Sequence, residues 1–304
     1  MRDMGPLTYH LVIQVDKVIR ERKSIPIRSD GMKIALIGAG GKMGVRLSLN
    51  LAKSDHEVAH VEVSEAGQAR LREAVGADCV PLAEALSGAQ AVVLAVPDTL
   101  IGKVAQGVVQ DLDPGTIVII LDAAAPYAGH LPKREDITYF VTHPCHPPIF
   151  SDEEREDRKD YFGGISARQS IVSALMQGPE EHYAAGEEIA RVIWAPILRS
   201  HRVTVEQMAL LEPGLSETMC ATLLKAMKDG LDEVVRRGVD PVAARDFLLG
   251  HMTILAAVTM NEIDGVFSDA CNKAIENGYP QILRDDWLKI FEPEEIAESI
   301  RRIT

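Results

Sequence analysis

The chain has 304 residues, of which 46% are hydrophobic and 25% are charged, a composition typical of a globular protein with room for two domains. Its formal net charge of −13 argues against nucleic acid and anionic membranes as partners, because both require basic patches, and favours small-molecule chemistry. The four cysteines show no C-x-x-C spacing, which argues against a disulfide framework or a structural zinc site and predicts a cytoplasmic location. No apolar run approaches the roughly 20 residues that a membrane span requires.

Residues 1–31 precede the first strong strand signal and lack the apolar core and cleavage site of a signal peptide. We predict a poorly ordered extension, with Met32 as the functional beginning of the protein. A short helix over Tyr9–Ile19 is the alternative.

The next stretch predicts a dinucleotide-binding unit. Ile34–Ile37 is typical of a buried parallel strand, a glycine-rich turn follows, and Val45–Ala52 is compatible with a helix. The glycine spacing is G-x-G-x-x-x-G from Gly38, whereas the usual G-x-G-x-x-G register ending on Gly44 would place alanine in the first position. We predict that the loop contacts a pyrophosphate through Gly38, Ala39, Gly40, Gly41, Lys42 and Met43.

A second strand, His56–Val63, carries an acid eighteen residues beyond Gly44, near the distance expected for a contact with the adenosine ribose. This acid, Glu62, favours NAD over NADP because it would repel a 2′-phosphate, and Val63 offers no cation to receive one. A solvated strand end is the alternative interpretation of Glu62.

The alternation of strands and helices continues beyond Val63. Further strands are predicted at 89–96 and 116–122, and helices at 68–75, 81–86 and 101–110. Ligands of such sheets bind at the carboxyl ends of the strands, so cofactor contacts are predicted at Val96, Pro97, Asp98 and Asp122, with Ala123–Pro126 as site lining. A plain strand exit is the alternative for each of the first three.

An apolar strand beginning at Ile137 delivers His143 and His146 to its carboxyl end, in a loop constrained by three prolines. Histidine is well suited to accept an alcohol proton near neutral pH, so one of the two is predicted to be a general base. A pair of metal ligands is the second interpretation, although no third ligand is evident nearby, and a structural pair is the third. Cys145 is predicted to pack rather than react.

The charged run at 151–160 predicts a solvated segment, and residues 164–203 predict two more strands around a helix at 180–194, which would extend the sheet. After Thr204 the pattern is helical only, with breaks predicted at Gly214, Gly238 and Gly278–Pro280. The predicted helices lie at 205–211, 216–236, 241–259 and 293–301. We therefore predict an α/β fold, with an N-terminal Rossmann domain at 32–203 and an all-α domain at 204–304.

Two features of the helical part bear on function. Glu212 and Glu217 flank a predicted Pro-Gly kink, where Glu217 is either the capping acid of a helix start or, with Glu212, a contact to substrate or Mg²⁺. Met252–Met260 is apolar nearly all round, as expected of a helix in a core or at a subunit interface, and His251 beside it is predicted to lie there too.

The order of parts from Met32 onward resembles the 6-phosphogluconate dehydrogenase-like superfamily, which implies that the helical domain completes the active site and forms a homodimer. Val141–Pro144 resembles the strand-end His-Pro of prephenate dehydrogenases, whose histidine contacts the hydroxyl being oxidised and corresponds to His143. Cys145–Pro148 and Glu212–Glu217 are more similar to bacterial oxidoreductases with a phosphogluconate-dehydrogenase-type C-terminal domain, a branch that includes sugar-acid oxidoisomerases. The Lys and Glu pair of true phosphogluconate dehydrogenases is not evident at matching positions, which argues against decarboxylation.

Together these features predict an NAD-dependent oxidoreductase acting on the hydroxyl of a small hydroxy acid or sugar acid. His143 would take the hydroxyl proton, while His146, Glu212 and Glu217 orient the substrate or a divalent ion such as Mg²⁺. The resemblance implies that a rearrangement follows oxidation. Two alternatives remain: a prephenate-like or β-hydroxyacid dehydrogenase without rearrangement, and a non-enzymatic NAD-binding redox sensor.

Overall fold

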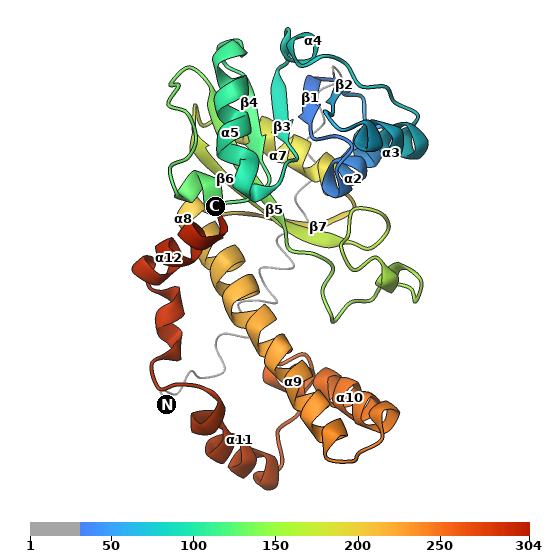
Figure 1. Ribbon diagram of the computed structural model, residues 1–304, viewed down its shortest axis with the longest axis vertical. Coiled ribbons are helices and arrows are strands. Elements are labelled where there is room, and N and C mark those ends of the chain that lie inside the picture. The colour runs from blue at the N-terminus through green and yellow to red at the C-terminus, as the bar shows by residue number, and fades with distance from the viewer. Residues whose placement is uncertain (1–30) are drawn as a thin grey trace. The chain divides into compact units, whose positions relative to one another are not determined.

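The computed structural model describes residues 31–304, so the extension predicted at 1–31 lies almost wholly outside the described residues. Residues 32–304 form one compact unit built on a seven-stranded sheet in the order β2-β1-β3-β4-β5-β6-β7 (Figure 1). The strands are β1 (Lys33–Ile37), β2 (Glu57–Val61), β3 (Ala91–Leu94), β4 (Ile117–Ile120), β5 (Thr138–Pro144), β6 (Gln169–Gln177) and β7 (Ile197–Arg202).

The sheet is parallel except where β6 runs antiparallel to β5. The register places five residues side by side across the sheet, namely Ile37, Val61, Leu94, Ile120 and Val141. The residues that follow them in the chain therefore emerge at one edge, where ligands of open α/β sheets bind.

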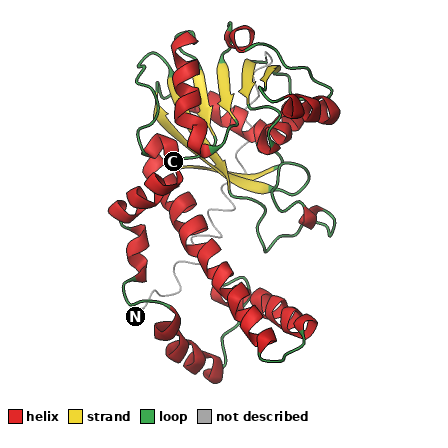
Figure 2. Cartoon of the chain, in the orientation of Figure 1, coloured by secondary structure: helices red, strands yellow, loops and turns green. Residues whose placement is uncertain are grey.

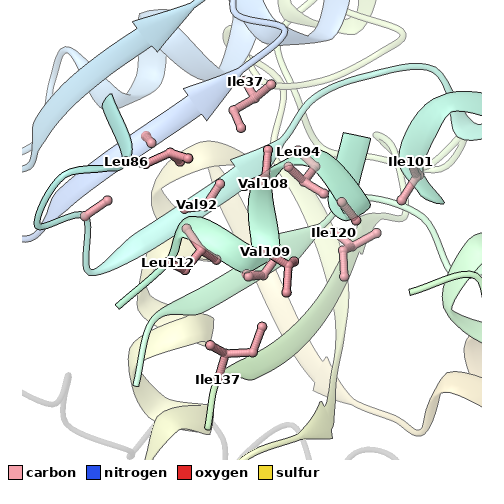
Figure 3. Packing of buried hydrophobic residues seen from close by; sticks show 14 of the residues in the cluster. Ile37, Leu86, Val92, Leu94, Ile101, Val108, Val109, Leu112, Ile120 and Ile137 are labelled. Atoms are coloured by element: carbon pink, nitrogen blue, oxygen red, sulfur yellow. The ribbon is translucent and has the colours of Figure 1, made fainter. Parts of the chain in front are cut away.

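Helices cover both faces of the sheet, which explains why its central strands are continuous apolar runs. On one face, alternate strand residues such as Val92 and Ile120 pack with Ile101 and Val108 of a helix (Figure 3). On the other face, Leu36 and Ile119 belong to a second cluster with side chains from three further helices. The helices of this part are α2 (Lys42–Leu51), α3 (Glu65–Val75), α4 (Leu82–Leu86), α5 (Asp98–Val108), α6 (Ala124–Tyr127) and α7 (His182–Ile193), with short 3₁₀ turns η1 (Val109–Asp111) and η2 (Asp157–Lys159).

The chain after β7 consists of helices and loops (Figure 2). Its elements are α8 (Val205–Ala209), η3 (Leu210–Ala221), α9 (Thr222–Arg236), α10 (Pro241–Thr259), α11 (Asp269–Ile282), η4 (Trp287–Phe291) and α12 (Pro293–Ile303). The break predicted at Gly238 is confirmed between α9 and α10. The Rossmann-type sheet, its extension and the helical C-terminal part are all confirmed.

The predicted break at Gly214 is wrong, because α8, η3 and α9 form one uninterrupted helical segment whose middle part, η3, has π-helical winding. Pro213 lies inside η3, where its missing N–H and its ring disfavour ordinary α-helical winding. Gly214 is buried: a Cβ built on it would lie 2.9 Å from Cδ1 of Ile296 in α12. Close packing against α12 therefore keeps this segment helical.

The second wrong break is Gly278–Pro280, which lies inside α11, a helix that the sequence analysis did not predict. Ser268 caps α11 by accepting a hydrogen bond from the backbone N–H of Cys271, and Pro280 falls in its last turn. Pro280 removes one backbone donor from that turn, and the helix nevertheless continues to Ile282.

The prediction that no apolar run approaches the length of a membrane span is wrong for α10. This helix has 19 residues with a mean hydropathy of 1.3 over an 18-residue window, so by length and composition alone it could cross a membrane. Only Ala244 and Ala257 of this helix are buried. It is therefore an apolar helix that the described chain leaves largely uncovered.

Candidate active site

The glycine loop joins β1 to α2 and has no room for a side chain at three of its positions. A Cβ on Gly40 would lie 2.3 Å from the carbonyl oxygen of Gly67 in α3. Gly38 has φ +82°, and a Cβ on it would lie 2.3 Å from the carbonyl oxygen of Ala95, which follows β3. A Cβ on Gly44 would lie 2.1 Å from the carbonyl oxygen of Gly38, so any side chain there would push α2 away from the loop. The structure therefore supports the spacing that begins at Gly38.

The start of α2 is suited to an anion. Gly41 precedes the helix, no side chain of the described residues caps it, and its first turn contains no acid. Within the described chain, the first backbone N–H groups, those of Lys42 and Met43 included, therefore have neither a capping side chain nor an acid in the first turn to offset the helix dipole. The crowded loop and the uncapped helix start together fit the pyrophosphate of a dinucleotide.

Glu62 follows β2 and lies beside the glycine loop. Its carboxylate accepts hydrogen bonds from the backbone N–H of Gly40 at 3.1 Å and of Ser64 at 2.9 Å. Val63 next to it is 94% exposed. Arg70 of α3, which the sequence analysis missed, donates to the carbonyl of Gly40 at 3.0 Å and brings a cation to this end of the site. This hydrogen bond depends on the packing of α3 against α2, so no local sequence pattern reveals the position of Arg70.

The strand ends beside β1 carry the next predicted residues. Val96 lies against Gly38, and Pro97 is the N-cap of α5, whose first residue is Asp98. Asp122 accepts a hydrogen bond at 2.6 Å from the backbone N–H of Ala124, the first residue of α6. Desolvation, and secondly the charge of Asp122, raise the pKa of Asp98.

His143 lies at the carboxyl end of β5, with 17% of its side chain exposed. Its Nδ1 is 2.8 Å from the carbonyl oxygen of Pro144 and 3.5 Å from Oε2 of Glu212. A carbonyl only accepts, so Nδ1 carries the proton in this hydrogen bond and Nε2 is left with the lone pair. Desolvation lowers the pKa of His143 although surrounding carboxylates, Asp122 foremost, oppose the effect, and the ring is therefore neutral near neutral pH.

Two carboxylates of the helical part, those of Glu212 and Glu217, lie near His143. Desolvation, followed by the charge of Asp122, raises the pKa of Glu212 to about 7. Desolvation and the charge of Glu212 also raise the pKa of Glu217. Glu217 is inside the continuous helical segment rather than at a helix start, so its interpretation as a capping acid is wrong.

His146 lies in the loop after β5 with φ +60°, a left-handed conformation that side chains rarely adopt. Its Nδ1 is 2.9 Å from the carbonyl oxygen of Phe162, and its ring centroid is 6.0 Å from that of His143, edge to face. Among the described residues, no three or more His, Cys, Asp or Glu side chains lie close enough together to hold a metal ion as arranged.

We name the group at this edge the histidine–carboxylate cluster; it comprises Asp98, Asp122, His143, His146, Glu212 and Glu217. Mutual electrostatic effects link its members, whereas Gly38–Met43 and Glu62 form the separate dinucleotide end. The cluster contains a neutral base and an acid that titrates near neutrality, a combination suited to moving protons to and from a polar substrate.

Comparisons with known proteins find two matching families and several similar relatives. The family described as "Phosphogluconate dehydrogenase (decarboxylating) C-term" matches residues 151–304, and the family described as "Rossmann-like domain" matches residues 19–128. D-apionate oxidoisomerase of Rhizobium rhizogenes is 68% identical over 272 residues, which cover 89% of this chain and 99% of the relative. D-apionate oxidoisomerase of Cupriavidus necator is 67% identical over 273 residues, covering 90% and 99%.

A solved structure resembles the whole described chain. It is a semialdehyde dehydrogenase NAD-binding protein from Cupriavidus necator in complex with calcium and NAD. Its TM-score is 0.89 at 66% sequence identity, and the match covers 90% of this chain and 99% of that one.

Proposed function

The chain belongs to the D-apionate oxidoisomerase family, and from this membership we propose that it is an NAD-dependent oxidoisomerase of D-apionate or a closely related branched sugar acid. The observation that carries the proposal is the position of His143, whose Nδ1 lies 3.5 Å from Oε2 of Glu212 at the carboxyl edge of the sheet. An acid–base pair in that place suits oxidation of an alcohol.

The dinucleotide end holds the cofactor in this proposal. The backbone of Gly38–Met43 and the start of α2 bind the pyrophosphate, Glu62 binds the adenosine ribose, and Val96–Asp98 and Asp122 line the path to the cluster. NAD, when bound, supplies the hydride acceptor. Glu62 disfavours NADP by charge repulsion, in agreement with the NAD complex of the Cupriavidus protein.

His143 acts as the general base. Its Nδ1–H is held by the carbonyl of Pro144, so the Nε2 lone pair accepts the hydroxyl proton of the substrate. Glu212 faces the protonated side of the ring, where its carboxylate stabilises the imidazolium that forms. General acid–base catalysis of this kind contributes about 10²–10⁴-fold to a rate.

The rearrangement requires proton movement without net gain or loss. One carbon substituent migrates with its bonding electron pair from the carbon that bears a hydroxyl to the adjacent carbonyl carbon, so one C–C bond breaks and one forms. The hydroxyl loses its proton and becomes the new carbonyl, and the oxygen of the former carbonyl gains a proton. Glu212, whose pKa is raised to about 7, is present in both protonation states at neutral pH and is the acid suited to this exchange. Its neutral form also limits the repulsion between the cluster and the carboxylate of a sugar acid, while His146 and Glu217 orient the substrate.

The test is NADH formation at 340 nm with NAD or NADP and ¹³C-labelled D-apionate, followed by NMR of the product skeleton, with and without EDTA. Turnover with NAD to a rearranged skeleton supports the proposal. An unchanged skeleton would instead indicate a prephenate-like or β-hydroxyacid dehydrogenase. If the protein is a redox sensor, His143→Ala should leave NAD binding and the biological output unchanged. Neither the wild type nor the variant should then turn over substrate. Loss of turnover in EDTA would indicate that the reaction requires a divalent cation such as Mg²⁺.

The proposal includes a homodimer that forms through α10 and a cytoplasmic location. Apolar residues of α10 are exposed, Phe247 by 69% and Val242 by 66%, and a second copy of the chain would bury them, as expected for an interface helix. Phe247→Asp should then convert a dimer to a monomer in light scattering, whereas a wild-type monomer would contradict the dimer.

All four cysteines are free in the described chain, which supports a reducing cytoplasm.

A further inference from the structure

One aromatic residue of the loop between β5 and β6 touches the helix at the dinucleotide end. The ring of Phe162 lies under two cations of α2: Nζ of Lys42 is 4.9 Å and Cζ of Arg46 is 5.3 Å from its centroid. Lys42 is the first residue of α2 and lies at the proposed pyrophosphate site. Contacts of this kind hold a cation in place without a formal ion pair.

The same residue touches the histidine–carboxylate cluster. The carbonyl oxygen of Phe162 is 2.9 Å from Nδ1 of His146, and the two rings meet edge to face with centroids 6.3 Å apart. His146 is held at φ +60° and meets His143 edge to face. A residue in so unfavourable a conformation depends on its surroundings for its position.

The loop is anchored independently of Lys42. The carboxylate of Asp160 accepts hydrogen bonds from the backbone N–H of Ile165 and Ser166 at 3.0 Å each and pairs with Arg46 at 3.4 Å. Arg46 also donates to the carbonyl of Gly163. Loss of the Lys42 contact would therefore remove one of the two cations that contact the ring of Phe162 and leave the loop attached to α2.

We propose that Phe162 is a positioning residue that couples dinucleotide binding at α2 to the orientation of His146. A phosphate is a stronger partner for an ammonium group than an exposed aromatic ring, so a bound pyrophosphate draws Lys42 away from Phe162. His146, which bonds to the carbonyl and packs against the ring of the same residue, then reorients. The inference rests on the proposed function for its site, and it predicts that the cofactor prepares His146 before the sugar acid binds.

The test uses the whole protein with ¹³C-labelled histidine and NADH as the only ligand. Saturating NADH should shift the His146 signal, assigned from a His146→Asn sample, in the wild type. The shift should persist in Phe162→Tyr, which keeps the ring, and disappear in Phe162→Leu while NADH still binds. The matched control is Tyr161→Leu, which removes an aromatic side chain that is 77% exposed in the same loop and should leave the shift unchanged.

Lys42→Gln provides a second route should Phe162→Leu not fold. It removes the cation, so His146 should no longer respond even when enough NADH is added to saturate the weakened site. A His146 signal that moves in Phe162→Leu or in Lys42→Gln as it does in the wild type would overturn the proposal.

A binding measurement adds a readout that a purely structural role would not change. NADH should strengthen D-apionate binding about fivefold or more in the wild type and in Phe162→Tyr, and by less than about twofold in Phe162→Leu. Equal strengthening in all three proteins would contradict the coupling. Absence of D-apionate binding in the wild type would count against the proposed function, while the NADH-only NMR experiment would still decide the role of Phe162.

Discussion

The replacement Glu212→Gln should stabilise the fold and impair the enzyme together. Glu212 is largely buried, with 23% of its side chain exposed, and its pKa is raised from 4.5 to about 7. At about 1.4 kcal/mol per pH unit, this shift corresponds to about 3 kcal/mol. The folded protein therefore incurs a free-energy cost when it ionises Glu212, and glutamine, which is neutral, avoids that cost.

The sign follows from proton linkage. Between pH 4.5 and about 7 the folded state keeps a proton that the unfolded chain has already lost, so the wild type loses stability as the pH rises through this window. Glu212→Gln should therefore exceed the wild type by about 3 kcal/mol at pH 8 and by only about 1 kcal/mol at pH 5. Its turnover should fall about 10²-fold or more, because glutamine neither exchanges a proton nor stabilises the His143 imidazolium.

Urea unfolding followed by tryptophan fluorescence at both pH values measures this difference. Glu206→Gln is the control in the same helical segment, because a hydrogen bond with the side chain of Thr204 lowers the pKa of Glu206 and its replacement should bring no gain at pH 8. An equal stability of Glu212→Gln and wild type at pH 8, or a gain of the same size at both pH values, would refute the reasoning.

Three further predictions concern the base and the dinucleotide end. The kcat/KM should rise through a pKa below 6.5, since only a neutral His143 accepts a proton. In His143→Asn this rising limb should vanish and kcat should fall about 10²–10⁴-fold, in initial rates from pH 5 to 8. Gly44→Ala should lower Tm by about 5 °C or more and weaken NADH binding, whereas Gly107→Ala in α5, with no atom within 4 Å of the new Cβ, should leave both intact in thermal and fluorescence titrations. Glu62→Gln should reduce the preference for NAD over NADP about tenfold in kcat/KM ratios, while Glu65→Gln in the first turn of α3 should not; an unchanged ratio in Glu62→Gln would contradict the ribose contact.

Much of the dinucleotide end could be predicted from local sequence. Strands buried on both faces are apolar in every residue, as in β3 and β4, and the backbone of the glycine loop tolerates no side chain at Gly38 or Gly44. Because the carboxyl ends of parallel strands share one edge, the chain order alone also indicated that Asp98, Asp122 and His143 would lie near one another.

The helical part was harder to predict because its breaks depend on packing. Gly214 and Pro280 are weak helix formers, yet both lie inside helices in the structure. For Gly214, contact with Ile296 and Phe291 outweighs local propensity, and the resulting continuous segment aims Glu212 at His143. Local propensity is worth about 1 kcal/mol per residue, less than tertiary packing can supply.

The sequence by itself determined the α/β order, the glycine loop and the chemical types of the proposed acid and base, since each depends on residues close together in the chain. Only the tertiary structure decided their environment: desolvation that lowers the pKa of His143 and raises that of Glu212, and the contacts of Arg70 and Phe162 with the ends of the site. Burial and charge at these groups come from segments far apart in sequence, Glu212 being brought to His143 by a helix that begins beyond the sheet. Such effects are properties of the assembled fold, and no local pattern encodes them.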